Sequence, residues 1–391
     1  MQEIYFDNSS TTRVCDQALA EAVKEMQQEY GNPGSVHHLG AQAFHALQAA
    51  HTSLASALHA LPEEIYFTGS GTEANNMLIF GVAEARARAG RRILVSAVEH
   101  PSVSEPAKYL LSRGFDVHFI PVDPQGRIRL DALAELLNEE TILVSIMHVN
   151  NETGTIQPLT EAGSLIRRLA PQAIFHVDGV QSFGRVAVDL AAWQADAFVA
   201  SGHKIHAPKG IALLWLKKER RIPPLLRGGG QERGMRSGTE NMPGICAFAK
   251  ASEIACAGMQ EYARQMHHVK QVLLDAVSAS LPDVYVNGPP LAEAAPHILN
   301  LSFPGARSEV LLHYLEEKGV YVSAGSACNS RSSKGSPVIE ALGISPERVD
   351  SALRFSFSRE NTPEEALAAA EVLQAAVTEI RLWMGRNRKR R

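Results

Sequence analysis

Short, continuously apolar runs alternate with helix-like segments through the first half of the chain. A continuous apolar run of this length is typical of a strand buried on both faces, whereas recurrence at three and four residues is typical of an amphipathic helix. The alternation predicts an α/β fold with a mainly parallel sheet flanked by helices on both faces. The expected strands lie at 4–6, 65–67, 92–96, 117–120, 141–146, 175–178 and 197–200, and the expected helices at 18–26, 41–60 and 130–137.

The order of elements changes in the last third of the chain. The pattern there predicts two long helices, 242–259 and one ending near 281, then strands at 284–286, 298–303 and 353–357, with a helix at 309–317. Thr362 and Glu365 have the spacing of a capping box, which predicts a last helix to about residue 383. We therefore expect a large cofactor-binding domain over 15–255 and a small α+β domain formed by 1–14 and 256–391.

The composition is that of an ordinary globular protein. The 391 residues are 45% hydrophobic and 20% charged, with a net charge of -4, which is ordinary for a globular protein and argues against a globally basic nucleic-acid binder. The tail 386–391 is locally basic. It is interpreted as a solvated end, the alternative being a docking segment for an acidic or RNA partner.

The cysteines and the N-terminus indicate a reducing compartment. Cys15, Cys246, Cys256 and Cys328 show no C-x-x-C pairing and no ligand-like spacing with the histidines, so neither a metal site nor a disulfide framework is expected. No charged-then-apolar leader begins the chain, and no apolar run of about 18 residues occurs. The expected location is the cytoplasm, without membrane association.

Two charged residues at expected strand ends suggest a cofactor. Lys204 follows the run 197–200, and Asp178 ends the preceding strand. The C-terminal edge of a parallel sheet is where ligands bind, so Lys204 is a candidate for covalent attachment to a carbonyl group, the alternative being an ordinary strand-end lysine. Lysine and aspartate together suggest pyridoxal phosphate, whose pyridine nitrogen the aspartate would keep protonated.

Further polar residues are expected at the same edge. Gly71 and Thr72 follow a strand and open a helix, which suits a phosphate group, although a Ser/Thr-capped helix explains the same pattern. His100 and Asn151 also follow strands and should face Asp178 and Lys204, although each alone fits an ordinary loop residue.

Three later features carry candidate chemistry. The glycine-rich segment 226–239 reads as an anion-binding or subunit-contact loop, or else a linker. Cys328 lies in the polar loop 324–336, where exposure would make it reactive unless it is an incidental surface thiol. Arg354 lies on a predicted strand and could grip a carboxylate with two N–H groups, the alternative being a salt bridge on the strand face.

Several longer motifs stand together between Tyr5 and about Arg359. They are Asp7-Asn8 with Thr11-Thr12, Gly31-Asn32-Pro33, Gly71-Thr72-Glu73, Glu99-His100, Met147-His148-Val149-Asn150-Asn151-Glu152, His176-Val177-Asp178, Ser201-Gly202-His203-Lys204, Arg233-Gly234-Met235-Arg236-Ser237-Gly238-Thr239, Gly325-Ser326-Ala327-Cys328 and Leu353-Arg354-Phe355-Ser356. With them the chain resembles the NifS/IscS-type cysteine desulfurases of the class V aminotransferase family. That resemblance implies the aminotransferase-like fold type I of pyridoxal-phosphate enzymes.

The resemblance also implies a role for each candidate. Lys204 would bind the cofactor, Asp178 would contact its pyridine nitrogen, and His100 would stack on its ring and handle protons. Asn151 and Arg354 would take the substrate carboxylate, and Cys328 would receive sulfur. The remaining cofactor contacts would come from Gln181 at the ring hydroxyl, from Gly71, Thr72, Ser201 and His203 at the phosphate, from Asn151, and from Thr239 of the other subunit of a homodimer.

The implied reaction converts L-cysteine to L-alanine and leaves a persulfide on Cys328. The expected acceptors are a protein for iron-sulfur cluster assembly or, equally, for tRNA thiolation. Longer members of the family carry a C-terminal segment that docks scaffold proteins, whereas this sequence ends in its basic tail, which favours the scaffold partner less. The alternatives are a selenocysteine lyase, an aminotransferase of the same fold, and a catalytically quiet assembly partner. Direct nucleic-acid binding is not expected.

Overall fold

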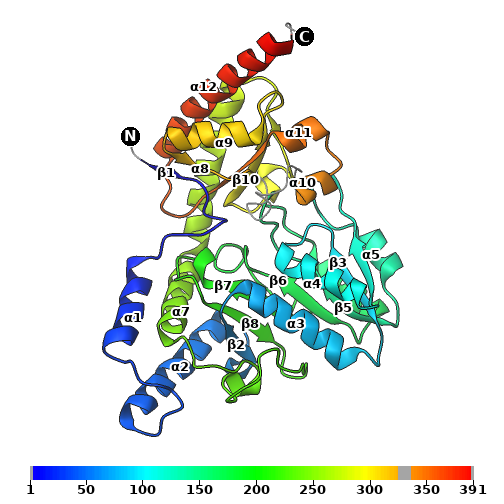
Figure 1. The fold of residues 1–391 in the computed structure, drawn as a ribbon, viewed down its shortest axis with the longest axis vertical. Helices are drawn as coiled ribbons and strands as arrows, with labels where there is room; N and C mark the ends of the chain where they lie inside the picture. The colour runs from blue at the N-terminus through cyan, green and yellow to red at the C-terminus, as the bar shows by residue number, and fades with distance from the viewer. Residues whose placement is uncertain (1–2, 325–335, 389–391) are drawn as a thin grey trace.

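A seven-stranded sheet forms the centre of the larger half of the molecule (Figure 1). The computed structural model describes residues 3–324 and 336–388. The strand order is β2-β8-β7-β6-β5-β3-β4. Its strands are β2 (Ile65–Thr68), β3 (Arg92–Ser96), β4 (Asp116–Ile120), β5 (Thr141–Ser145), β6 (Ile174–Asp178), β7 (Ala197–Ser201) and β8 (Ala212–Leu216).

The predicted mainly parallel sheet is confirmed, with one exception. Strands β7, β6, β5, β3 and β4 pair in parallel, whereas β8 runs antiparallel to both β7 and β2. Strand β8 is absent from the predicted strands. An apolar run carries no mark of its direction, so the reversal depends on the short turn between Lys204 and β8.

Helices cover both faces of this sheet. Residues alternate along each strand: Phe198 and Leu213 belong to one buried cluster, while Val199 and Leu214 belong to the other. Because both sets are buried, the strands show the uninterrupted apolar runs noted above. The first face is covered by α1 (Asp16–Gln27), α2 (His38–Ala57), α5 (Leu130–Leu136), α6 (Leu159–Leu169) and α7 (Met242–Ala257), and the second by α3 (Gly71–Arg86) and α4 (Pro101–Ser112).

A second hydrophobic cluster forms the smaller half (Figure 1). Ile4 and Phe6 of the N-terminal segment lie in this cluster together with residues of the last third of the chain. The capping box is present, because Glu365 N donates to Thr362 Oγ1 at 3.3 Å and Thr362 N donates to the Glu365 carboxylate at 3.1 Å. The elements are β1 (Ile4–Tyr5), α8 (Met259–Ser280), β9 (Tyr285–Val286), β10 (Ile298–Ser302), α9 (Ser308–Glu317), β11 (Val320–Tyr321), α10 (Pro337–Ala341), α11 (Pro346–Asp350), β12 (Ala352–Ser356) and α12 (Pro363–Arg388).

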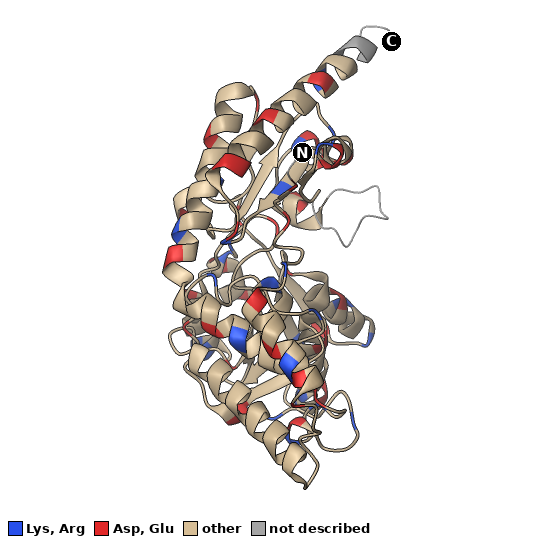
Figure 2. Ribbon diagram, turned by 90° about the vertical axis from the view of Figure 1, so that its left-hand side faces the viewer, with Lys and Arg blue, Asp and Glu red and all other residues tan. Residues whose placement is uncertain are grey.

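Charged residues of both signs are interspersed along the molecule (Figure 2). None of the helices over 3–324 and 336–388 is long and apolar enough to cross a membrane. The domain boundaries at residues 14 and 255 stay a prediction.

Candidate active site

Four predicted residues meet at the carboxyl edge of the parallel strands. Asp178 is the last residue of β6, and Lys204 closes the short 3-10 helix that follows β7. His100 caps the N-terminus of α4 after β3, and Asn151 follows β5. Since these strands are neighbours in the order β7-β6-β5-β3, the predicted convergence of the four positions at one edge is observed.

Lys204 is held by the N-terminal segment. Its Nζ donates to Ser9 O at 2.5 Å and to Ser10 O at 2.7 Å. Burial lowers the pKa of Lys204 to about 7, and the positive charges of Arg354 and Arg185 act in the same direction. At neutral pH about half of the amine is therefore neutral, against about one part in three thousand for an ordinary lysine. Lys204 is thus suited to nucleophilic attack.

Asp178 is a buried carboxylate held only by neutral donors. It is 4% exposed; its Oδ1 accepts from Val180 N at 3.0 Å and its Oδ2 accepts from Asn75 Nδ2 at 2.9 Å. None of the ion pairs within the described ranges includes Asp178. Because a buried charge is costly without a partner, this carboxylate fits a cationic group such as a protonated pyridine nitrogen.

A short hydrogen-bond chain fixes the His100 ring. Asn75 Nδ2 lies 2.8 Å from Ser102 Oγ, which lies 2.9 Å from His100 Nδ1. Ser102 N also donates to Nδ1 at 3.1 Å, so Nδ1 is an acceptor and the neutral ring carries its proton on Nε2. Burial lowers the pKa of His100, which favours this neutral form.

A cavity of about 360 Å³ lies beside the start of α3. Its lining includes Ser10, Thr11, Ser70, Ser201 and His203. A methyl group on Gly71 would approach Val180 Cγ2 to 3.1 Å, so the first residue of α3 packs closely against the turn that follows Asp178. The helix N-terminus and the hydroxyls suit a phosphate dianion.

His203 and Gln181 complete this side of the site. His203 Nδ1 lies 3.2 Å from Thr11 Oγ1, and burial lowers the pKa of His203 to about 4, so the ring is neutral at physiological pH. Gln181 Nε2 donates to Ser9 O at 3.0 Å, and Arg185 Nη1 donates to Gln181 Oε1 at 3.1 Å. Both side chains are therefore oriented by the protein itself.

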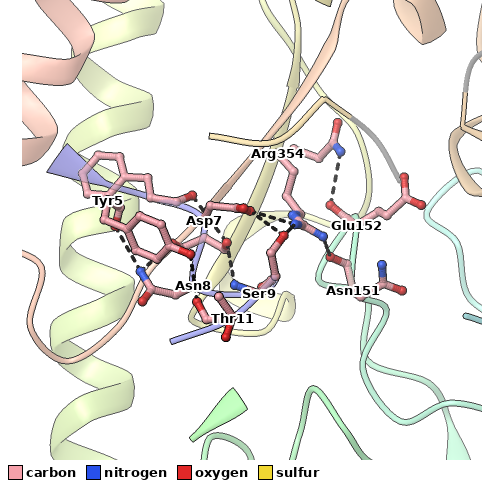
Figure 3. A network of polar contacts seen from close by, with 12 residues as sticks. Tyr5, Asp7, Asn8, Ser9, Thr11, Asn151, Glu152 and Arg354 are labelled. Carbon is pink, nitrogen blue, oxygen red and sulfur yellow. Dashed lines mark hydrogen bonds and ion pairs between the residues drawn. The ribbon is translucent and has the colours of Figure 1, made fainter. Parts of the chain in front are cut away.

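Arg354 of β12 lies opposite, next to Asn151 (Figure 3). Its Nη1 donates to Asn151 O at 2.9 Å, while the Asn151 Oδ1 atom is buried without a hydrogen-bond partner among the described residues. Asp7 Oδ1 lies 2.9 Å from Arg354 Nη2. Arg354 and Asn151, the two residues predicted to bind the substrate carboxylate, therefore lie in contact, and Asn151 Oδ1 has no hydrogen-bond partner among the described residues.

Comparison with known proteins places this geometry in a family. Residues 4–368 match the model of the aminotransferase class-V family. The chain belongs to this family. A cysteine desulfurase IscS of Methanosarcina thermophila is 39% identical over 97% of this chain and 93% of its own length.

Solved structures agree with this assignment. A NifS-like protein superposes with a TM-score of 0.91 at 35% identity, covering 96% of this chain and all of its own. A structure of SspA in complex with cysteine has a TM-score of 0.79 at 29% identity, covering 91% and 99% of the two chains. The predicted resemblance to NifS/IscS-type cysteine desulfurases and the predicted fold type are confirmed. Dependence on pyridoxal phosphate is a general property of this class-V family.

Two predicted residues of the class-V site are not placed at this sheet edge by the described residues of this chain. Cys328 lies in the segment 325–335, outside the described residues. Thr239 is described and exposed, and its predicted contact would be made with another subunit. Thr72, in the first turn of α3, is likewise exposed. Among the residues described, no group of three or more His, Cys, Asp or Glu side chains could hold a metal ion.

Sequence reasoning missed several residues that orient this class-V site. Asn75 and Ser102 hold Asp178 and His100, and Arg185 donates to the Lys204 carbonyl. Glu99 is buried, and burial next to Asp178 raises its pKa well above the usual value. The one usable signal was Asn75, which lies four residues after Gly71 and therefore on the same face of α3.

Proposed function

We propose that this class-V family member is a pyridoxal-phosphate-dependent cysteine desulfurase that converts L-cysteine to L-alanine and transfers the sulfur to Cys328. The observation that carries the proposal is that Lys204, whose pKa burial lowers to about 7, lies at the same sheet edge as the buried Asp178, which forms no ion pair among the described residues. The relatives named cysteine desulfurase support it.

The site's residues fit the cofactor one by one. Asp178 would face the pyridine nitrogen, His100 would stack on the ring, and Gln181 would contact the ring hydroxyl. The phosphate would lie at the start of α3, next to the cavity that Ser201 and His203 line. When bound, the cofactor's contribution is an electron sink for a negative charge formed at the substrate's Cα. Gly71, Thr72 and Asn151 would add further contacts, with Thr239 reaching in from the second subunit of a homodimer.

Lys204 and His100 would share the proton transfers. The neutral amine of Lys204 would hold the cofactor covalently and, once released, would take the proton from the substrate's Cα. Because Ser102 N and Oγ occupy His100 Nδ1, the ring has one exchangeable proton, on Nε2. In its neutral form His100 would therefore present Nε2–H to the site as a hydrogen-bond donor.

Arg354 and Asn151 would orient L-cysteine through its carboxylate. The buried Asn151 side chain has an unused Oδ1, and its amide nitrogen can donate to the substrate. Holding the carboxylate would fix the orientation of the bonds at Cα, and so would select which of them reacts.

Sulfur transfer would occur at Cys328. Its thiolate attacks the sulfur of the activated substrate; the S–S bond forms as the Cβ–S bond breaks, and the electron pair remains on the carbon skeleton. Protonation of that carbon gives alanine, so L-cysteine and one thiol become L-alanine and one persulfide. The persulfide would pass to a protein acceptor of iron-sulfur cluster assembly or tRNA thiolation in the cytoplasm.

The test uses two variants of the cofactor-loaded protein. Cys328→Ser should keep the visible absorption of the bound cofactor and its change on adding L-cysteine, but lose alanine production. Cys256→Ser, at a half-buried cysteine of α7, is the matched control and should keep alanine production. Full alanine production by Cys328→Ser, or transamination products from the unmodified protein, would overturn the proposal.

A further inference from the structure

The Asp7 carboxylate forms an ion pair with the guanidinium group of Arg354. Its Oδ1 accepts from Arg354 Nη2 at 2.9 Å (Figure 3). Ser10 Oγ accepts from the same nitrogen at 2.7 Å. Ser10 Oγ in turn lies 2.9 Å from Asp7 Oδ1. The Arg354 side chain is 4% exposed and that of Asp7 is 20% exposed. Asp7 therefore supplies the negative charge that this buried cation requires.

The guanidinium group of Arg354 has no free pair of parallel N–H groups that could bind both oxygens of a carboxylate. A guanidinium offers two parallel N–H groups on one edge through Nε and Nη2, and on another through Nη1 and Nη2. Nη2 belongs to both edges, and its two hydrogens are taken by Asp7 and Ser10. Nη1 donates once, to Asn151 O, and Nε has no partner among the described residues. An incoming carboxylate can make only single contacts unless it replaces one of these acceptors.

The backbone on either side of Asp7 is fixed against β12. Ser356 N donates to Phe6 O at 2.7 Å, and Asn8 N donates to Ser356 O at 3.2 Å. Ser9 N donates to Ser356 Oγ at 2.8 Å. Arg354 lies two residues before Ser356 on the same strand. The position of the Asp7 carboxylate next to Arg354 is therefore set by the fold and not by a flexible surface side chain.

We propose that Asp7 is a positioning residue that stands in for the substrate carboxylate on Arg354, so that an amino-acid substrate binds by displacing Asp7. The proposal rests on the proposed function, because it takes Arg354 as the carboxylate-binding group. Asp7 keeps Arg354 extended and charge-compensated before substrate arrives. The displacement opposes substrate binding, so Asp7 sets how tightly amino acids are held.

The proposal predicts that the affinity for an amino acid rises when the contact between Asp7 and Arg354 is weakened. Asp7→Asn keeps the shape and a neutral acceptor oxygen but removes the charge, and hydrogen bonds to charged groups are about twice as strong as neutral ones. We expect the pyridoxal-phosphate-loaded Asp7→Asn protein to bind L-alanine about five- to tenfold more tightly than the unmodified protein. Ethylamine, which is L-alanine without the carboxylate, should bind both proteins within about twofold.

Titration of the bound cofactor's visible absorption measures both dissociation constants. The ethylamine arm removes any effect of Asp7 on the reactivity of Lys204, because that effect acts on both amines. Asp7→Glu should return L-alanine affinity toward that of the unmodified protein. The matched control is Asp350→Asn, which breaks an exposed ion pair with Arg307 and should change neither constant.

Weaker or unchanged L-alanine binding by Asp7→Asn, or equal shifts for L-alanine and ethylamine, would overturn the proposal. If circular dichroism shows that Asp7→Asn is unfolded, Ser10→Ala takes its place, since it frees the other Nη2 hydrogen; it too must bind L-alanine more tightly. Alanine production from L-cysteine by the unmodified protein is measured in parallel. Its absence would refute the desulfurase function, while the two titrations would still decide the role of Asp7.

Discussion

Asn75 provides the sharpest test of how the Asp178 carboxylate is held. The side chain is fully buried, and its Nδ2 donates to Asp178 Oδ2 at 2.9 Å and to Ser102 Oγ at 2.8 Å. Asn75→Ala removes one hydrogen bond to a charged group, worth about 1.5–3 kcal/mol, and one neutral bond, worth about 1 kcal/mol. We expect the free energy of unfolding of the cofactor-free protein to fall by about 2.5–4 kcal/mol, measured by urea denaturation.

The same substitution should weaken cofactor binding. Asp178 would keep a single donor, Val180 N, so its carboxylate would be less well oriented toward the pyridine nitrogen. We expect the affinity for pyridoxal phosphate to fall about tenfold, which corresponds to about 1.4 kcal/mol. The assay is titration of the cofactor-free protein, followed by visible absorption.

A matched control separates this effect from a general loss of stability. Asn287 is 1% exposed in the smaller half, and its Nδ2 donates to Asn300 Oδ1 at 2.8 Å and to Ser302 Oγ at 2.7 Å. Asn287→Ala should lower the free energy of unfolding by a similar amount and leave cofactor affinity unchanged. Equal losses of cofactor affinity in the two variants would refute the reasoning.

Three further predictions follow from the described contacts. The rate at which cofactor-free protein is covalently loaded should rise with pH to a midpoint near 7, because the neutral amine of Lys204 is the nucleophile; stopped-flow absorption measures it, and a rate that still climbs above pH 9 would contradict the lowered pKa. His176 is fully buried, which lowers its folded-state pKa to about 4, below the ordinary 6.5, so the unfolded chain binds the extra proton and stability should be lost as pH falls from about 6.5 to 4. His176→Asn should therefore reduce the slope of unfolding free energy against pH by up to about 1.4 kcal/mol per unit in that window, and an unchanged slope would count against it. Thr362→Ala, which breaks the capping box of α12, should cost about 1 kcal/mol in urea denaturation, with Thr52→Ala on the exposed face of α2 as the comparison.

Much of the sheet could be predicted because its strands are buried on both faces. Apolar runs placed the strand ends, and the rule for parallel sheets then brought Asp178 and Lys204 to one edge although 26 residues separate them. The reversal of β8 could not be predicted in this way, since the apolar residues Ala212–Leu216 would suit a strand of either direction. Strand direction is decided by how the chain returns to the sheet.

The polar residues that orient the site were harder to find. Arg354 was chosen because it interrupts an apolar strand, but its partner Asp7 lies 347 residues away in the sequence. Asn75 shares a face of α3 with Gly71, but the sequence does not show that it contacts Asp178, and Arg185 carries no local signal at all; tertiary contacts give both residues their roles. Local pattern predicts elements, whereas a buried hydrogen-bond network depends on which elements the fold brings together.

The most direct test of the account is to incubate the cofactor-loaded protein with L-cysteine in the absence of reductant, quantify the products and weigh the peptide that contains Cys328 by mass spectrometry. The account predicts L-alanine together with one added sulfur on Cys328. Pyruvate or no product, with an unmodified Cys328, would contradict it.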